Sequence, residues 1–140
     1  MNNYYYLDSF CGQWTTKKSL YLLKNKSEYK YEENFEILKD IEKQINTKLL
    51  FKNDRANFLY QLDDNLHIKK FKNNFNETYN VKIFDKNLIK IEKEINYKEL
   101  IYQEYIYSAS ENVKISFSLL KKQNQYLFIL FTSYIKKINK

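Results

Sequence analysis

The 140-residue sequence contains no proline and a single glycine, Gly12. Tight turns between antiparallel strands normally use Gly, Asn or Asp, because these residues tolerate the backbone angles that such turns need. We therefore expect asparagine to occupy most of the turns. The absence of Pro- and Gly-rich stretches also leaves no candidate linker, so residues 1–140 are predicted to form one domain.

The sequence also has only one cysteine, Cys11, and one histidine, His67. A single cysteine excludes an internal disulfide and is compatible with a reducing compartment. Without a second Cys or His, no metal site is predicted. No apolar run reaches the ~18 residues of a membrane-spanning helix, and the first residues lack the basic and apolar regions of a signal peptide. We expect a soluble protein with neither a metal nor a membrane span.

Negative charge is in deficit, and the formal net charge is +7. An excess of lysine can indicate a nucleic-acid or membrane surface. Here the lysines alternate with Glu and Asp along the chain, and no nucleic-acid-binding motif is present. Nucleic acid is therefore not a predicted partner. A basic nucleic-acid-associated protein is kept as the weaker alternative, which a salt-dependent affinity for RNA or DNA would reveal.

What the sequence does contain is a series of short segments with the composition of β-strands, bounded by Asn, Asp and Lys. The segments are 12–23, 27–33, 49–52, 57–62, 66–71, 78–84, 88–95, 99–109, 112–121 and 125–138. One stretch differs, because Phe35, Leu38, Ile41 and Ile45 recur at helical spacing and predict a helix over 34–46. Many strands with no β–α alternation favour a mainly β fold, an antiparallel barrel of about eight to ten strands with one helix.

The most informative segment is the predicted hairpin 104–118. Alternation puts Glu104, Ile106 and Ser108 on one face of its first strand. In the second strand, Asn112, Lys114, Ser116 and Ser118 share one face, and Val113, Ile115, Phe117 and Leu119 share the other. Antiparallel sheets usually bury the apolar face, which would place Lys114 in water. The alternative is that the polar face lines an interior ligand site.

The hairpin resembles a strand pair of the S-type phycobiliprotein lyases, which has the pattern E-x-I-W-F-A-x-x-N-L-R-L-R-x-S. The residues at the matching positions, without a gap, are Glu104, Ile106, Tyr107, Ser108, Ala109, Asn112, Val113, Lys114, Ile115, Ser116 and Ser118. The family opening G-x-W-x-S-x-R-T-x-Y-x-L is matched by Gly12, Trp14, Thr16, Lys18, Ser19, Tyr21 and Leu23. The family ending S-E-I-R is matched by Ser133, Tyr134, Ile135 and Lys136.

The resemblance implies a lipocalin-like barrel, similar to the fatty-acid-binding proteins, that holds a phycobilin such as phycoerythrobilin or phycocyanobilin as its substrate. It implies a lyase that joins this linear tetrapyrrole by a thioether to a cysteine of a phycobiliprotein subunit in the plastid stroma. No permanently bound cofactor is implied, and a homodimer is a further expectation. A non-catalytic bilin carrier on the same barrel is the alternative.

The resemblance also implies roles for individual residues. By position, Glu104 and Lys114 are the implied catalytic residues. The implied bilin-binding residues are Lys18, Asn112, Ser118, Trp14, Tyr134 and Lys136. The sequence differs from the family in using lysine for several arginines and in lacking tryptophan on the central strands, where Phe58, Tyr60 and Phe71 are candidate aromatic walls.

Overall fold

The computed structural model describes residues 9–40, 47–52, 57–62, 67–72, 75–95 and 99–138. These residues form antiparallel strands joined by turns, and they contain no helix. The strands are β1 (Gly12–Leu22), β2 (Ser27–Asp40), β3 (Thr47–Lys52), β4 (Asn57–Leu62), β5 (His67–Lys72), β6 (Phe75–Asp85), β7 (Leu88–Ile95), β8 (Leu100–Ser110), β9 (Val113–Lys122) and β10 (Gln125–Lys136). The predicted mainly β class is confirmed.

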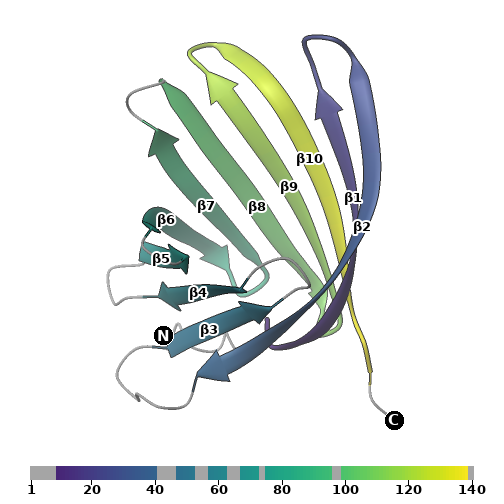
Figure 1. Cartoon of the computed structure of the whole chain (residues 1–140), viewed down its shortest axis with the longest axis vertical. Coiled ribbons are helices and arrows are strands. Elements are labelled where there is room, and N and C mark those ends of the chain that lie inside the picture. The colour runs from purple at the N-terminus through teal and green to yellow at the C-terminus, as the bar shows by residue number, and fades with distance from the viewer. Residues whose placement is uncertain are drawn as a thin grey trace.

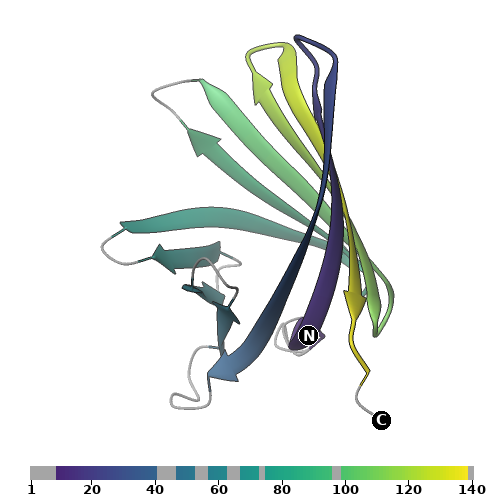
Figure 2. The same cartoon turned by 45° about the vertical axis from the view of Figure 1, so that its right-hand side comes forward.

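The strands close into one barrel in which each strand pairs with its neighbours in the chain, and β1 pairs with β10. The long strands β8, β9 and β10 lie side by side, and the short strands β3, β4 and β5 lie at the opposite lower side (Figure 1). Figure 2 shows the same two groups of strands from another direction. Closure removes the unpaired sheet edges and leaves an inner and an outer face on every strand.

Asparagine is present in each hairpin turn that the structure describes in full, as the shortage of glycine predicts. These residues are Asn25, Asn87, Asn112 and Asn124. The left-handed backbone positions nevertheless belong to other residues, since Lys26, Glu99 and Gln123 have φ angles of 55°, 54° and 53°. Asparagine is therefore present in these turns, but the positive φ angles belong to Lys26 and Gln123, which are next to Asn25 and Asn124, and to Glu99.

The helix predicted over 34–46 is wrong where the structure describes it, because residues 34–40 belong to β2; residues 41–46 lie outside the described part. Phe35 pairs with Trp14 on β1 and is buried, whereas Leu38 is 37% exposed. The side chains of Phe35 and Leu38 therefore point to opposite faces of a strand. Pairing with β1 on one side and β3 on the other satisfies the backbone of this segment, which local helical spacing cannot override.

The polar face of the 104–118 hairpin points into the barrel, contrary to the usual pattern of antiparallel sheets. Lys114 is 1% exposed, and Ser116 and Ser118 are fully buried. The apolar face lies outside, where Ile115 is 47% exposed. A row of polar groups is therefore withdrawn from water, which is costly unless each group finds a hydrogen-bond partner.

One end of the barrel is covered by the turn at Ser9 and Phe10. The Trp14 indole donates a hydrogen bond to the Phe10 carbonyl oxygen (2.8 Å), and the Lys136 ammonium donates to the Ser9 carbonyl oxygen (3.2 Å). Gly12 has a φ of 139°, and a Cβ there would lie 3.0 Å from Cδ of Lys136. Glycine is needed at this position both for the backbone angle and for the space that Lys136 occupies.

Candidate functional site

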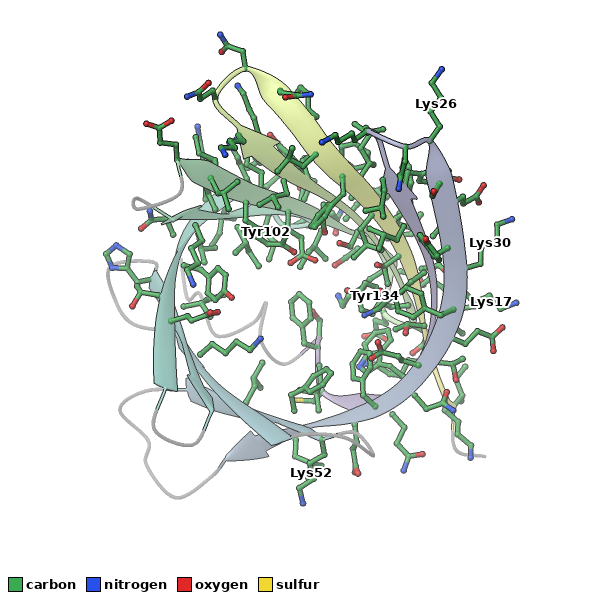
Figure 3. All side chains as sticks on the ribbon, turned by 45° about the horizontal axis from the view of Figure 1, so that its top comes forward. Lys17, Lys26, Lys30, Lys52, Tyr102 and Tyr134 are labelled. Atoms are coloured by element: carbon green, nitrogen blue, oxygen red, sulfur yellow. The ribbon has the colours of Figure 1, made fainter. Side chains whose placement is uncertain are left out.

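The barrel encloses a cavity of about 450 Å³. Its walls are mainly apolar and include Phe35, Phe51, Ile68, Val81, Ile89 and Ile106. Tyr102 and Tyr134 lie on the inner side of the wall, whereas Lys17, Lys30 and Lys52 point outward (Figure 3). A largely apolar cavity of this size with a few polar groups is typical of a small-molecule site.

Glu104 is the acidic group of this cavity. It lies on β8, and its Oε2 accepts hydrogen bonds from the hydroxyls of Ser116 (2.7 Å) and Ser118 (3.4 Å) on the neighbouring β9. The Tyr102 hydroxyl donates in turn to Ser118 Oγ (3.3 Å). These contacts follow from the strand register, which sets Glu104 opposite Ser118. The alternating serines of the sequence thus serve to hold one carboxylate inside the barrel.

Burial raises the pKa of Glu104 above its usual value, although the serine hydroxyls, the charge of Lys18 and Tyr102 act in the opposite direction. Burial and the nearby Glu104 also raise the pKa of Tyr134, so its phenol stays protonated. A carboxyl group with a raised pKa keeps its proton to a higher pH than an exposed carboxyl does, and this favours a role as a general acid or base.

Lys114 lies at the end of the cavity near the Ser9–Phe10 turn. Its ammonium donates hydrogen bonds to Oγ of Ser108 (2.7 Å) and of Ser9 (3.0 Å), and it lies 4.4 Å from the centroid of the Phe10 ring. Burial, together with the positive charge of Lys136, lowers the pKa of Lys114 to about 8. Among the described residues, no carboxylate pairs with Lys114 or with Lys136. Two cations close together at an apolar cavity form a favourable position for an anion.

The family resemblance implies that Lys18 binds the bilin, but Lys18 does not share the cavity with Lys114. It lies on the inner face of β1 but is 3.5 Å from the Glu33 carboxylate, and it is not among the residues that line the cavity. Its charge still acts on Glu104, whose pKa it lowers. The structure therefore places Lys18 as an electrostatic neighbour of Glu104, already paired with another carboxylate.

The remaining predicted site residues separate into two groups. Trp14 and Tyr134 line the cavity, with ring centroids 6.3 Å apart in an edge-to-face contact. Ser118 contacts Glu104, and Lys136 lies 5.0 Å from the Trp14 ring centroid. Asn112 is instead in the turn after β8, where its backbone N–H donates to Ser110 Oγ (3.3 Å) and its carbonyl accepts from the Lys136 N–H (2.8 Å).

Several cavity residues were missed from the sequence. The most notable are Lys70, Glu77, Tyr79 and Lys93. They lie on β5, β6 and β7, in the part of the chain where the resemblance is weakest. Alternation alone could have placed Glu77 and Tyr79 on the same face, but nothing in the sequence shows that this face points inward. The side chains of the candidate wall residues Phe58, Tyr60 and Phe71 lie outside the described part.

Comparison with known proteins supports the resemblance along the whole chain. No family model matches the sequence. A chromophore lyase CpcS/CpeS homolog from Gracilaria tenuistipitata var. liui is 26% identical in an alignment that covers 95% of this chain and 96% of the relative. The solved structure of the S-type phycobiliprotein lyase CPES from Guillardia theta superposes with a TM-score of 0.72 at 10% identity, covering 100% of this chain and 95% of that one. The similarity to S-type phycobiliprotein lyases predicted from the sequence is therefore confirmed, and with it the lipocalin-like barrel fold.

Proposed function

We propose that this protein is a bilin lyase, which binds a phycobilin in the barrel cavity and attaches it to a cysteine of a phycobiliprotein subunit. The observation that supports the proposal best is the cavity that holds Glu104 and Lys114 on adjacent strands behind apolar walls. The curated relative and the solved neighbour are both chromophore lyases. Because lysine carries a single ammonium without the planar fork of arginine, propionate binding here rests on charge more than on shape.

The chemistry of a linear tetrapyrrole matches the groups in the cavity. Its pyrrole N–H groups are donors for the Glu104 carboxylate, and a propionate is an anion for Lys114, with Lys136 close by. Attachment is an addition, in which the acceptor thiol sulfur bonds to the ring-A ethylidene carbon and the thiol proton ends on the adjacent ring carbon. No oxidant or reductant is consumed. We assign Glu104 the movement of a proton near the pigment nitrogens.

A non-catalytic bilin carrier would use the same cavity, so the two functions are separated by transfer. We expect the protein, mixed with free phycobilin and an apo-phycobiliprotein subunit, to produce pigment that stays on the subunit after denaturation. Cysteine-to-serine replacement in the subunit is the control, because it removes the thiol. Pigment that remains on the barrel and never becomes covalent would support the carrier, and an unchanged absorbance spectrum on adding the bilin would contradict both functions.

The same proposal includes the identity of the bilin, the acceptor subunit and the plastid stroma as the site of action. Gracilaria, the source of the curated relative, is a red alga, and phycobiliprotein lyases act in plastids. Among the described residues no helix has the length and hydropathy to cross a membrane. Titration with phycoerythrobilin and phycocyanobilin in parallel would identify the pigment by the larger absorbance shift.

The outward apolar face of β9 and β10 is the surface on which we expect the predicted homodimer. Ile115, Phe131 and Ile135 are 47%, 45% and 52% exposed, and the strand register brings them together with Tyr107 of β8. Contiguous exposed apolar groups of this kind mark interaction surfaces. Light scattering should give twice the mass of the chain, and Ile115→Lys should give a monomer. A monomer in the unaltered protein at all concentrations would refute this assignment.

A further inference from the structure

The Ser9–Phe10 turn contacts both lysines at the end of the cavity that it covers. Oγ of Ser9 accepts a hydrogen bond from the Lys114 ammonium (3.0 Å), and the carbonyl oxygen of Ser9 accepts one from the Lys136 ammonium (3.2 Å). The Phe10 ring lines the cavity, with its centroid 4.4 Å from the Lys114 ammonium. One residue of the turn therefore supplies an oxygen atom to each lysine, at the place where the proposed function puts a propionate.

The two carboxylates among the described residues that line the cavity lie elsewhere. Glu104 stands opposite Ser118 in the strand register, and Ser118 is four residues, or about 13 Å of strand, from Lys114. Glu77 lies on β6, where its Oε1 is 3.0 Å from the Lys93 ammonium. The described contacts include no ion pair between either carboxylate and the two lysines that contact the turn. The described hydrogen-bond acceptors of those two lysines are uncharged.

Uncharged acceptors leave the positive charges of Lys114 and Lys136 in place. After burial, the charge of Lys136 is the second cause of the lowered pKa of Lys114, so the two ammonium groups repel each other. A carboxylate would offset both charges, and hydrogen bonds between ionised groups are stronger than those to neutral oxygens. Because Ser9 bridges the two lysines, a ligand carboxylate that bridges them takes the place of Ser9.

We propose that Ser9 and a ligand carboxylate compete for Lys114 and Lys136, so that binding of the carboxylate displaces the Ser9–Phe10 turn from the end of the barrel. The inference rests on the proposed function, in which the carboxylate is a propionate of the pigment. The turn then acts as an internal competitor, and the apparent affinity is the intrinsic affinity reduced to the fraction of molecules whose turn is displaced. Ser9 thereby sets how tightly the barrel holds a pigment that has a free carboxylate.

The residues next to the turn report its position. Cys11 follows Phe10 directly and packs against Leu49, a buried residue of the cavity wall. Trp14 also holds the turn, because its indole donates a hydrogen bond to the Phe10 carbonyl oxygen (2.8 Å). The chain has a single cysteine, so modification of a thiol reports on this place alone. Displacement of the turn should separate Cys11 from Leu49 and make its thiol more accessible.

The first test compares biliverdin, a linear tetrapyrrole with two propionates, with its dimethyl ester in absorbance titrations of the full-length chain. We expect Ser9→Ala to strengthen binding of the free acid by up to about tenfold, because a competing hydrogen bond to a charged group is removed. Ser9→Asp places a carboxylate of the chain itself on the lysines and should weaken binding of the free acid by about tenfold. Both variants should bind the ester within about twofold of the parent, since the ester has no carboxylate to compete.

The second test follows the reaction of Cys11 with N-ethylmaleimide by intact mass. Saturating biliverdin should speed up the labelling of Cys11 by about tenfold, because the thiol reacts in molecules whose turn is displaced. The dimethyl ester should leave the labelling rate within about twofold of the rate without pigment. The rate is measured on the parent and on both Ser9 variants, each with its own saturating concentration of pigment.

Ser110 provides the matched control, because it is an exposed serine at the end of β8, where its Oγ accepts a hydrogen bond from the Asn112 backbone N–H (3.3 Å). Ser110→Ala and Ser110→Asp should leave both affinities and the labelling rate unchanged. Tighter binding of the free acid by Ser9→Asp, or equal acceleration of Cys11 labelling by acid and ester, would overturn the inference while the proposed function stands. So would labelling that biliverdin does not change. Failure of the unaltered chain to bind either pigment would refute the inference and the proposed function together.

Discussion

Replacing Glu104 with glutamine is expected to reduce transfer of the bilin to its acceptor subunit by about 100-fold, the lower range for loss of a general acid or base. The amide keeps the shape of the side chain and can still accept hydrogen bonds from Ser116 and Ser118. It cannot exchange a proton, and it loses the charge that attracts pyrrole N–H groups. Binding should weaken by about 10- to 100-fold for the same reason. Single-turnover transfer and absorbance titration measure the two effects separately.

The same variant should be more stable than the unaltered protein at neutral pH. Because folding raises the pKa of Glu104 above the ordinary value of 4.5, the folded chain holds this proton more tightly than the unfolded chain does. The contribution of Glu104 to stability is then complete below pH 4.5 and is lost as the pH rises through the raised value. We expect the Tm of Glu104→Gln to exceed that of the parent by a few degrees at pH 7 to 8, and the difference to shrink toward pH 4.5.

Glu92→Gln is the matched control for Glu104→Gln, because Glu92 is a carboxylate on the neighbouring strand that faces outward and accepts a hydrogen bond from Gln103 (3.1 Å). Its transfer rate should equal that of the parent. Normal pigment uptake and transfer by Glu104→Gln would defeat the assignment of Glu104 to the site. A Tm difference that does not change with pH would show that ionisation of Glu104 does not oppose folding.

Replacing Lys114 with alanine is expected to weaken bilin binding by about 10- to 100-fold, because an anion in an apolar cavity loses the cation that neutralises it. The side chain is 1% exposed, so alanine also leaves a cavity, and Lys114→Met is a second variant that fills most of the space. Both variants should remain folded, as judged by far-UV circular dichroism. The affinity is measured by titration with the free-acid pigment.

The dependence of binding on pH distinguishes a charge effect from a packing effect. The pKa of Lys114 is lowered to about 8 by burial and by Lys136. Below pH 8 the Lys114 amine is already protonated and can bind a carboxylate. Above pH 8 it must first take up a proton, and this weakens binding. We therefore expect the affinity of the unaltered protein to fall by up to about tenfold per pH unit above pH 8, and that of Lys114→Met to change much less over the same range.

Lys121 provides the control for Lys114, since it lies on the same strand with its ammonium 5.7 Å from the centroid of the exposed Tyr126 ring. Lys121→Ala should bind the pigment like the parent at every pH. A pH profile that is the same in the parent and in Lys114→Met would show that Lys114 does not hold the carboxylate. In that case Lys70 and Lys93 would be the remaining lysines among the described lining residues.

Local pattern predicted most strands well, and it failed where a segment's partners decide its conformation. β4 (Asn57–Leu62) and β7 (Leu88–Ile95) begin and end at the expected residues, because strand composition and turn residues agree there. The predicted helix failed because Phe35 and Leu38, which share a face at helical spacing, lie on opposite faces of β2. Pairing of β2 with β1 and β3 supplies backbone hydrogen bonds that no local count of apolar residues can anticipate.

In the candidate site, too, local pattern predicted some features and tertiary structure decided others. Which residues of the hairpin share a face follows from alternation, so the grouping of Glu104 with Ser108 and of Lys114 with Ser116 and Ser118 was available from the sequence. Which face is interior was not, because the usual rule for antiparallel sheets gives the opposite answer to the one observed. The family resemblance identified the correct face for β8 and β9. It gave no information on β5 to β7, where Lys70, Glu77 and Lys93 line the cavity.

Local sequence was enough to predict a mainly β, antiparallel fold, its Asn-containing turns and the sets of side chains that lie on common faces, because these depend on neighbours within a few residues. The three-dimensional structure was needed to show that the polar sets face inward, that Lys18 pairs with Glu33 and that Lys93 stands between Tyr79 and Tyr102. Those relations arise from the register between strands that follow one another in the chain, and from closure of the barrel by the pairing of β1 with β10. Closure fixes which face of each strand is enclosed.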